Sequence, residues 1–182
     1  MKTSLLFLFA STLLFSCQPK EQKSDKQTQQ SSFDEKAETA AIMKVIDNET
    51  KCFFDGNYEC WASNWVHEKY AMQEWNNDAG SYDAAIGWDK INQQGKSYIE
   101  KYYKNGKNVV HPQFKRETPQ VKFFGENAAY LIWKQYNTDQ ENKFFLISQD
   151  TRIMEKQADG WKIVNVTSLW DSKTRIPIDS IK

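Results

Sequence analysis

The sequence of 182 residues lacks an excess of charge of either sign, because 24 Lys and Arg are balanced by 24 Asp and Glu. It therefore offers no broad electrostatic attraction to nucleic acid, and we expect no nucleic-acid partner. Two His are too few for a His-rich metal site, and three Cys are too few for a disulfide scaffold. The sequence contains no glycine-rich phosphate loop, nucleophile elbow or zinc-ligand spacing, so it implies no cofactor and no metal.

A hydrophobic run long enough to span a bilayer is also missing, since such a run needs about 20 residues. The apolar stretch over residues 5–15 is interrupted only by Ser11 and Thr12, and it follows Lys2. A positive residue before an apolar stretch of this length is typical of a secretory signal peptide, which we assign to residues 1–16.

The segment Leu14-Phe15-Ser16-Cys17 ends this stretch and resembles the lipobox of bacterial lipoproteins, although Phe15 departs from the usual small or β-branched residue. The resemblance implies cleavage before Cys17, acylation of that residue and a membrane contact through the lipid. Several acyl chains on one residue give a stable anchor. Gln18, in place of Asp, favours the outer membrane of a bacterial cell envelope. The alternative is an ordinary secretory signal with an incidental Cys.

Residues 17–31 carry no aromatic or aliphatic side chain after Cys17. Such a segment buries too little surface to offset its ordering entropy, so it predicts a flexible tether. About 15 residues of this kind would span roughly 20 Å. A domain is predicted from residue 32 to residue 168, followed by a C-terminal tail over residues 169–182, of which residues 175–182 are expected to pack loosely.

Helical periodicity characterises the first half of this domain. Ser32 and Glu35 fit a capping box, apolar side chains recur at helical spacing from Ile42 to Phe53, and Gly56 gives a stop signal. The predicted helices cover residues 33–54, 58–66 and 88–104.

The second half favours strands separated by turns. Turn signals occur at Pro119 and at residues 125–127, 138–142 and 158–160, and the Asp-Gly pair before Trp161 is a strong hairpin signal. The predicted strands cover residues 109–116, 120–124, 128–137, 143–156 and 161–168. Helices followed by a meandering antiparallel sheet indicate an α+β fold.

Four segments resemble the nuclear transport factor 2-like superfamily, and within it the bacterial polyketide-cyclase-like (SnoaL-like) branch. They are IDNET (46–50), FFDGNYECW (53–61), IGWDKI (86–91) and GWKIVNV (160–166). The resemblance implies a cone-shaped α+β barrel, in which three N-terminal helices pack in a curved, mostly antiparallel sheet and leave a pocket at the wide end. Members include isomerases, dehydratases, cyclases, transport factors and oligomerisation modules, so the function has to be argued from pocket residues.

Glu49 is a candidate pocket residue, because it lies on the apolar stripe of the first helix, between Ile46 and Phe53. In the steroid isomerases of the superfamily, the position seven residues before the helix-ending glycine carries a tyrosine that donates to the substrate. Glu49 stands seven residues before Gly56, and an ionised carboxylate donates no hydrogen bond. It is either a ligand acceptor or an acid or base, or a structural residue held by a Trp, Arg or backbone donor.

A second group of candidates follows the second helix. His67 is a candidate for proton transfer, and Glu74 lies roughly where the isomerases carry a catalytic Asp. Tyr70 and Trp75 offer flat apolar faces to a ligand ring. The alternative places His67 on the surface and packs both aromatic residues into the mouth of the core.

The last two strands supply polar candidates. Period-two alternation places Asn165 and Thr167 on the same face as Trp161 and Ile163, where they would hydrogen-bond a ligand. Arg152, in the neighbouring strand, either points inward and binds a ligand carboxylate or points outward as a surface charge.

Cys52 and Cys60 flank the turn around Gly56. An exported protein meets an oxidising compartment, and a bridge that closes a loop of about nine residues would contribute roughly 2.5 kcal/mol. Two buried free thiols are the alternative.

The leading interpretation is an envelope-anchored lipoprotein whose pocket binds a small, partly apolar molecule. The expected contacts are Tyr70, Trp75, Trp88, Trp133, Arg152, Asn165 and Thr167, together with Glu49. One alternative is a SnoaL-like enzyme that uses Glu49, His67 or Glu74 for proton transfer. Another is a structural module that forms homodimers through the outer face of the sheet.

Overall fold

The computed structural model describes residues 33–77, 79–104, 107–108, 113–139 and 141–181, and these belong to a unit that begins at Phe33. The predicted signal peptide, the lipidation site at Cys17, the tether and the predicted cap at Ser32 lie outside the described residues. None of the helices that the structure describes combines the length and the apolar character needed to cross a bilayer.

Three helices form where the periodicity predicts them: α1 (Glu35–Phe54), α2 (Tyr58–Ala62) and α3 (Trp88–Tyr102). The cap of α1 is Asp34, whose carboxylate accepts hydrogen bonds from the backbone N–H groups of Lys36 and Ala37 at 3.0 and 3.1 Å. Gly56 follows the end of α1 with a φ of 70°, a left-handed conformation that glycine adopts without strain.

The second helix is shorter than predicted, because the chain after Ala62 bonds to the last strand instead. The N–H of Ile163 donates to the carbonyl of Asn64 at 2.8 Å, and the N–H of Val66 donates to the carbonyl of Ile163 at 3.0 Å. These bonds use backbone groups that a continued helix would need, so the helix ends.

The described residues form a seven-stranded sheet in the order β2-β1-β9-β8-β7-β5, with β6 also paired to β7. Neighbouring strands are antiparallel except β1 and β9, which are parallel. The strands are β1 (Met72–Asn76), β2 (Tyr82–Ile86), β5 (Phe114–Arg116), β6 (Gln120–Phe123), β7 (Ala128–Thr138), β8 (Phe144–Gln157) and β9 (Gly160–Pro177). A separate two-stranded ladder joins β3 (Tyr103–Lys104) to β4 (Lys107–Asn108).

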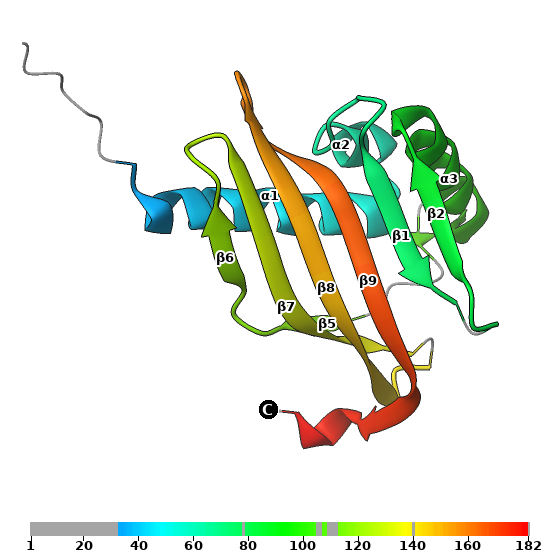
Figure 1. Cartoon of the computed structure of the whole chain (residues 1–182). Coiled ribbons are helices and arrows are strands. Elements are labelled where there is room, and N and C mark those ends of the chain that lie inside the picture. The colour runs from blue at the N-terminus through cyan, green and yellow to red at the C-terminus, as the bar shows by residue number, and fades with distance from the viewer. Residues whose placement is uncertain (1–32, 78, 105–106, 109–112, 140, 182) are drawn as a thin grey trace, which may run out of the picture. The chain divides into compact units, whose positions relative to one another are not determined.

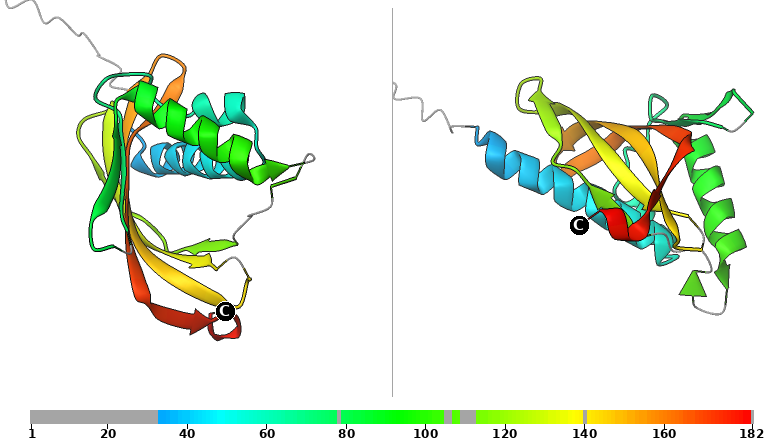
Figure 2. Two further views of the ribbon diagram at one scale, coloured as in Figure 1. Left: turned by 90° about the vertical axis from the view of Figure 1, so that its right-hand side faces the viewer. Right: turned by 90° about the horizontal axis from the view of Figure 1, so that it is seen from below.

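The helices lie on one side of this sheet, which curves around them (Figures 1 and 2). Together with the strand order, this arrangement confirms the predicted α+β fold, with three helices packed in a curved, mostly antiparallel sheet. The hairpin β1–β2 was not predicted. The prediction that the last strand ends at residue 168 was wrong, because β9 continues to Pro177 and residues 169–177 therefore belong to the sheet rather than to a C-terminal tail. Residues 109–112 of the predicted strand 109–116 lie outside the described residues.

An extra residue in β9 changes which side chains face the helices. Ile153 pairs with Asn165, but the next residue of β8, Met154, pairs with Ile163, which leaves Val164 as a bulge. Because a bulge adds one residue to one strand, the alternation of β9 reverses at Val164. Trp161 and Ile163 face inward before the bulge, and Val166, Ser168 and Trp170 face inward after it.

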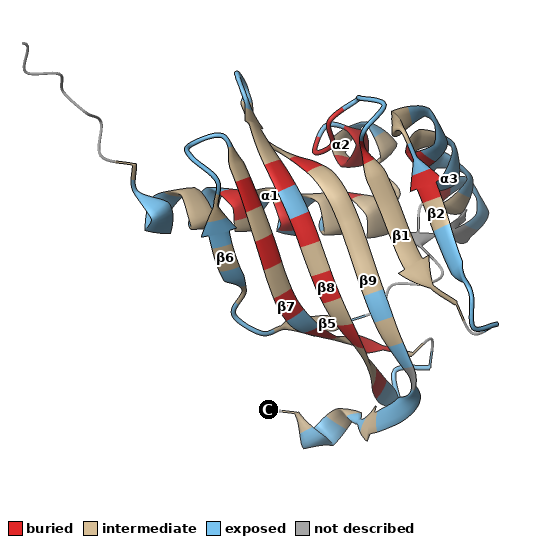
Figure 3. Cartoon of the chain, viewed as in Figure 1, coloured by how far each residue is buried: buried red, intermediate tan, exposed pale blue. Residues whose placement is uncertain are grey.

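Buried residues alternate mostly with partly buried ones along β7 and β8, as Figure 3 shows by colour. The inward side chains of β7 are apolar at Ala129, Leu131 and Trp133, and they become polar at Gln135 and Asn137. The apolar core therefore fills one end of the curved sheet, and polar side chains line the other.

Glu38 connects α1 to the last two strands, since its carboxylate accepts hydrogen bonds from Lys156 and from the indole N–H of Trp161, each at 2.7 Å. These donors lower the pKa of Glu38 below its ordinary value of 4.5. A carboxylate with a lower pKa in the folded state adds stability above the unfolded-state pKa and loses it as the pH falls through the folded-state pKa.

We therefore expect Glu38→Gln to lower the free energy of unfolding at neutral pH by about 1 kcal/mol. The difference between variant and wild type should shrink as the solution is acidified below the ordinary pKa of a Glu. Urea denaturation at neutral and acid pH measures both. A difference of the same size at every pH would contradict the assignment to the ionised carboxylate.

Candidate functional site

A cavity of about 490 Å³ opens between α1 and the inward face of strands β5, β7, β8 and β9. Its apolar lining comes from the end of α1 and from three strands, and its polar lining comes mainly from β5, β7 and β8. The apolar residues are Phe53, Phe54, Phe114, Leu146 and Trp170. The polar ones are Glu49, Thr50, Arg116, Gln135, Asn137, Thr138, Asp139, Asn142, Asp150, Arg152 and Ser168.

Arg152 points inward, as one of the two predicted orientations requires. Its side chain is 7% exposed, and its guanidinium carbon lies 5.0 Å from the centre of the Trp133 ring. It donates to the carbonyl of Thr151 at 2.8 Å and to the Asp150 carboxylate at 3.3 Å. Among the described residues, its Nε has no hydrogen-bond partner. Arg152 therefore keeps donor groups that its neighbours do not use.

Asp150 is the acceptor at the centre of this polar region and is 2% exposed. The hydroxyl of Ser148 donates to one oxygen of its carboxylate at 2.6 Å, and Ser168 donates to the other at 3.0 Å. With the bond from Arg152, both oxygens of Asp150 are engaged. Asp150 thus holds its neighbours in place and has little capacity left to bind a ligand.

Arg116 supplies a second guanidinium, which approaches from β5 and is 8% exposed. Its carbon lies 5.9 Å from the centre of the same Trp133 ring. Arg116 donates to Gln135 at 2.8 Å, to the hydroxyl of Thr50 at 2.9 Å and to the Asp47 carboxylate. Burial lowers the pKa of Arg116 below the ordinary value of an arginine, the Asp47 carboxylate opposes this effect, and the positive charge of Arg152 adds to it. The positive charges of Arg116 and Arg152 therefore repel each other.

Glu49 lines the cavity, and it also has the structural partner that one alternative predicted. Its Oε1 accepts the indole N–H of Trp61 at 2.8 Å, and its Oε2 accepts the hydroxyl of Thr50 at 3.3 Å. The predicted position facing the cavity is therefore found, while both carboxylate oxygens are occupied by neighbours.

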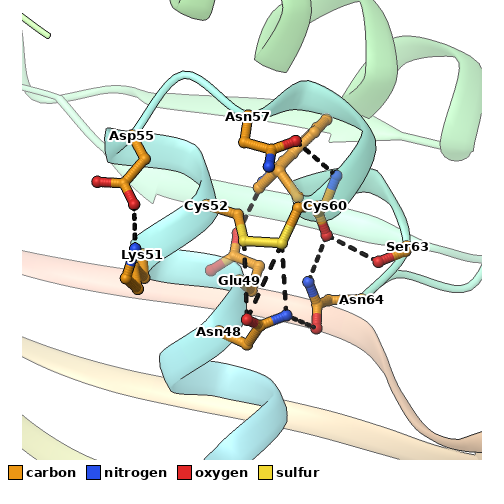
Figure 4. The surroundings of a disulfide bond; sticks show 10 residues. Asn48, Glu49, Lys51, Cys52, Asp55, Asn57, Cys60, Ser63 and Asn64 are labelled. Carbon is orange, nitrogen blue, oxygen red and sulfur yellow. Dashed lines mark hydrogen bonds and ion pairs between the residues drawn. A yellow bond between two sulfur atoms is a disulfide. The ribbon is translucent and has the colours of Figure 1, made fainter. Parts of the chain in front are cut away.

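The Cys52–Cys60 disulfide forms next to Glu49, so of the two alternatives for these residues the bridge is present. It joins the last turn of α1 to α2 (Figure 4). Asn48 donates to the side chain of Asn64 at 3.2 Å, and Asn64 donates to the carbonyl of Cys60 at 2.6 Å. The bridge and these amides hold α2 against the part of α1 that lines the cavity.

Reduction of this bridge, or replacement of both cysteines by Ala, should lower the free energy of unfolding by roughly 2.5 kcal/mol, because the unfolded chain regains the entropy of the closed loop. Urea denaturation with and without a reductant measures the loss. The double Ala variant serves as the control, since a reductant should not change its stability. No effect of reductant on the wild type would mean that the bridge contributes nothing to folding.

Three predicted polar residues lie on the face of the sheet that points away from the helices. After the bulge, Asn165 and Thr167 share the outward side of β9 with Leu169, which is 57% exposed. The hydroxyl of Thr167 donates to Glu74 at 2.9 Å and to Asn165 at 3.1 Å. The prediction that these three residues line the pocket was therefore wrong. The reversed alternation of β9 moves Asn165 and Thr167 to the outer face, and Glu74 of β1 pairs with Thr167 and points to the same side.

Other predicted residues also lie outside this cavity. His67 is exposed and stacks on Trp88 with ring centres 3.9 Å apart, as the surface alternative predicted. Tyr70 is 55% exposed and donates to Glu155 on the outer side of β8 at 3.0 Å. Trp88 packs against Trp61 rather than lining the cavity. Trp133 lies next to the two guanidiniums, and Trp75 lines a different cavity.

The sequence reasoning missed several residues of the cavity, most importantly Arg116 and Asp150. A signal existed for Asp150, because it stands two residues before Arg152 and therefore shares its face of the strand. Arg116 lies in a strand of three residues, which is too short for an alternation pattern to be read. Within the described part of the chain, no three His, Cys, Asp or Glu side chains lie close enough together to hold a metal ion.

No protein-family model and no curated protein matches this sequence. Solved structures do match. An NTF-2-like protein of unknown function from Shewanella oneidensis is 16% identical with a TM-score of 0.54, and the match covers 72% of this chain and 98% of that one. The association domain of C. elegans CaMKII is 18% identical with a TM-score of 0.56, over 74% and 96% of the two chains.

A ketosteroid isomerase-like protein from Erwinia carotovora is 13% identical with a TM-score of 0.51, over 74% of this chain and 97% of that one. Similarity at these identities concerns the fold and not the activity. Together with the curved α+β sheet, these matches show that the domain has a nuclear transport factor 2-like fold.

Proposed function

We propose that the domain binds a small organic anion, most simply a carboxylate with an apolar body, in the cavity lined by Arg116 and Arg152. The observation that supports this most is the placement of two buried guanidiniums beside one indole ring in a cavity that also has an apolar lining. Guanidinium groups bind carboxylates through paired hydrogen bonds, and burial strengthens such bonds.

The hydrogen-bond inventory of the cavity supports an anionic ligand over a cationic one. The carboxylates of Glu49 and Asp150 already accept bonds from their neighbours. A guanidinium has five N–H donors. Arg152 donates hydrogen bonds to protein acceptors through its two terminal nitrogens, while its Nε has no partner among the described residues. A ligand that brings acceptor oxygens would complete these donors and reduce the repulsion between the two cations.

The ligand-binding interpretation has more support than the acid–base enzyme. Of the three residues predicted for proton transfer, His67 and Glu74 lie outside the cavity, and Glu49 is hydrogen-bonded to Trp61 and Thr50. We therefore propose binding as the function, with isomerase, dehydratase or cyclase chemistry as the alternative.

The direct test measures binding of benzoate, phenylacetate, hexanoate and octanoate by calorimetry, with the corresponding uncharged amides as controls. We expect at least one carboxylate to bind and its amide to bind much more weakly. Arg152→Met should reduce the affinity about 10- to 100-fold, because charge-assisted hydrogen bonds are lost. Lys122→Met removes an exposed cation on β6 and should change nothing. Equal binding of carboxylate and amide, or an Arg152→Met variant that binds like wild type, would contradict the proposal.

Membrane anchoring through an acylated Cys17 is a separate proposal, supported by the lipobox-like segment that precedes it. Mass spectrometry of the mature protein from its own host would detect the acyl chains. A mature chain that begins at Cys17 without added mass, or that begins elsewhere, would contradict it.

The homodimer through the outer face of the sheet also stays a proposal. Its support is that Ile153 and Leu169 are 42% and 57% exposed on that face, and light scattering over a range of concentrations tests it.

A further inference from the structure

We propose that a second cavity, between α3 and strand β1, binds a neutral, hydroxyl-rich ring such as a sugar. This cavity has a volume of about 460 Å³. Its lining residues are Phe53, Gln73, Trp75, Gln93, Gln94, Gly95, Ser97, Tyr98 and Lys101. The proposal does not depend on the organic anion proposed for the first cavity, because the two cavities share only Phe53 among their lining residues.

One wall of the second cavity is fixed by strand pairing. Gln73 and Trp75 pair with Val166 and Ser168 of β9, which face inward after the bulge. Alternation therefore places both side chains on the inward side of β1, while Glu74 between them points outward to Thr167. The wall thus carries one amide and one indole, two residues apart.

The other wall is one side of α3, whose position is set by tight packing. Gly95 lies against Trp61 so closely that a Cβ atom at this position would be 2.2 Å from the indole ring. Ile91 and Ile99 are buried on the same helix. Because these contacts hold the helix in place, Gln93, Gln94 and Ser97 face the cavity from a rigid element.

The polar groups of this cavity have hydrogen-bond capacity that the protein does not use. Among the described residues, no side-chain hydrogen bond involves Gln73, Gln93 or Gln94, or the indole N–H of Trp75. Each Gln amide has two N–H donors and one carbonyl acceptor. A sugar hydroxyl is both a donor and an acceptor, so several amides beside one ring match a ligand with many hydroxyls.

The charge and the aromatic surface of the cavity agree with this ligand class. The lining has one charged side chain, Lys101, and four neutral polar ones, Gln73, Gln93, Gln94 and Ser97, so most of its hydrogen-bonding groups are uncharged. Trp75 presents an indole, and Phe53 and Tyr98 stack on each other with ring centres 4.7 Å apart. Flat aromatic surfaces bind the apolar C–H face of a ring, while a polar tip remains for hydroxyl groups.

Binding of neutral saccharides to the folded domain tests the proposal. The probes are methyl β-glucoside, maltose, cellobiose and N,N′-diacetylchitobiose, and the readouts are saturation-transfer NMR and tryptophan fluorescence. We expect at least one probe to bind at millimolar concentration. Trp75→Ala and Gln73→Ala should each weaken that binding at least about tenfold, since each removes a contact to the ring. Gln93→Ala, at an exposed residue of α3 that also lines the cavity, is a third variant in case either of these fails to fold.

Lys122→Met is the matched control, because Lys122 is exposed on β6 and lines neither cavity, so the variant should leave saccharide binding within about twofold of wild type. Failure of all four probes to bind would overturn the proposal. It would also be overturned by binding that survives all three variants of the second cavity, or that is lost in Lys122→Met. If no carboxylate binds in the first cavity, the expected saccharide binding in the second cavity is unchanged.

Discussion

Asp150→Ala should lower the free energy of unfolding by about 3–5 kcal/mol, because it leaves the buried charge of Arg152 without its carboxylate. Asp150 is 2% exposed and Arg152 is 6% exposed, so water does not replace the missing partner. Two further donors, Ser148 and Ser168, lose the acceptor of their hydrogen bonds at the same time. Leaving a buried polar group unpaired costs more free energy than its hydrogen bond contributed. All three losses therefore lower the free energy of unfolding.

Urea denaturation of wild type and variant measures this loss. Glu141→Ala is the matched control, because Glu141 is an exposed carboxylate paired with Lys143 at 2.5 Å, and its removal should change stability little. The double variant Asp150→Ala, Arg152→Met should recover part of the stability, since the uncompensated charge is then gone. If Asp150→Ala is no less stable than Glu141→Ala, the buried pair does not hold this part of the sheet together.

Much of the fold follows from local signals in the sequence. Gly56 ends α1, and the Asp-Gly pair before Trp161 forms the turn between β8 and β9, because each of these residues favours a turn whatever surrounds it. The long strands β7 and β8 were predicted to within about two residues, since turns bound them on both sides.

The candidate site was harder to predict, because its residues depend on a one-residue shift in the pairing of β9 with β8. The extra residue Val164 reverses the alternation of β9, so Asn165 and Thr167 exchange faces with Val166 and Ser168. Nothing in the local sequence requires a bulge there, since Val has a high preference for regular strands. The bulge becomes visible only when β9 is paired with β8, which is a tertiary property.

Arg116 shows a second limit of sequence reasoning. Its partners Asp47, Thr50 and Gln135 lie 19 to 69 residues away along the chain, and the sequence does not indicate such distant contacts. Arg152 was identified because it lies in a long strand, but its orientation stayed open until the pairing with Val166 fixed it. The sequence thus identified one of the two guanidiniums, and the fold placed them beside the same indole.

Trp61→Ala should lower the free energy of unfolding by about 3–5 kcal/mol, because it leaves a large cavity in the core. Trp61 is 1% exposed. Its ring contacts the rings of Phe53 and Trp88 at 5.8 Å between centres, and Gly95 of α3 packs directly against it. The variant therefore loosens all three helices at once.

Trp61→Phe separates this packing role from the hydrogen bond to Glu49. It keeps an aromatic ring but removes the indole N–H, so we expect a smaller loss of about 1–3 kcal/mol. Combining it with Glu49→Leu in a double-mutant cycle, followed by urea denaturation, isolates the energy of the bond. A coupling of about 1 kcal/mol would establish Glu49 as a structural residue of the α1–α2 corner. A coupling near zero, with carboxylate binding changed by Glu49→Gln alone, would instead assign Glu49 to the ligand and contradict the structural role that its bond to Trp61 indicates.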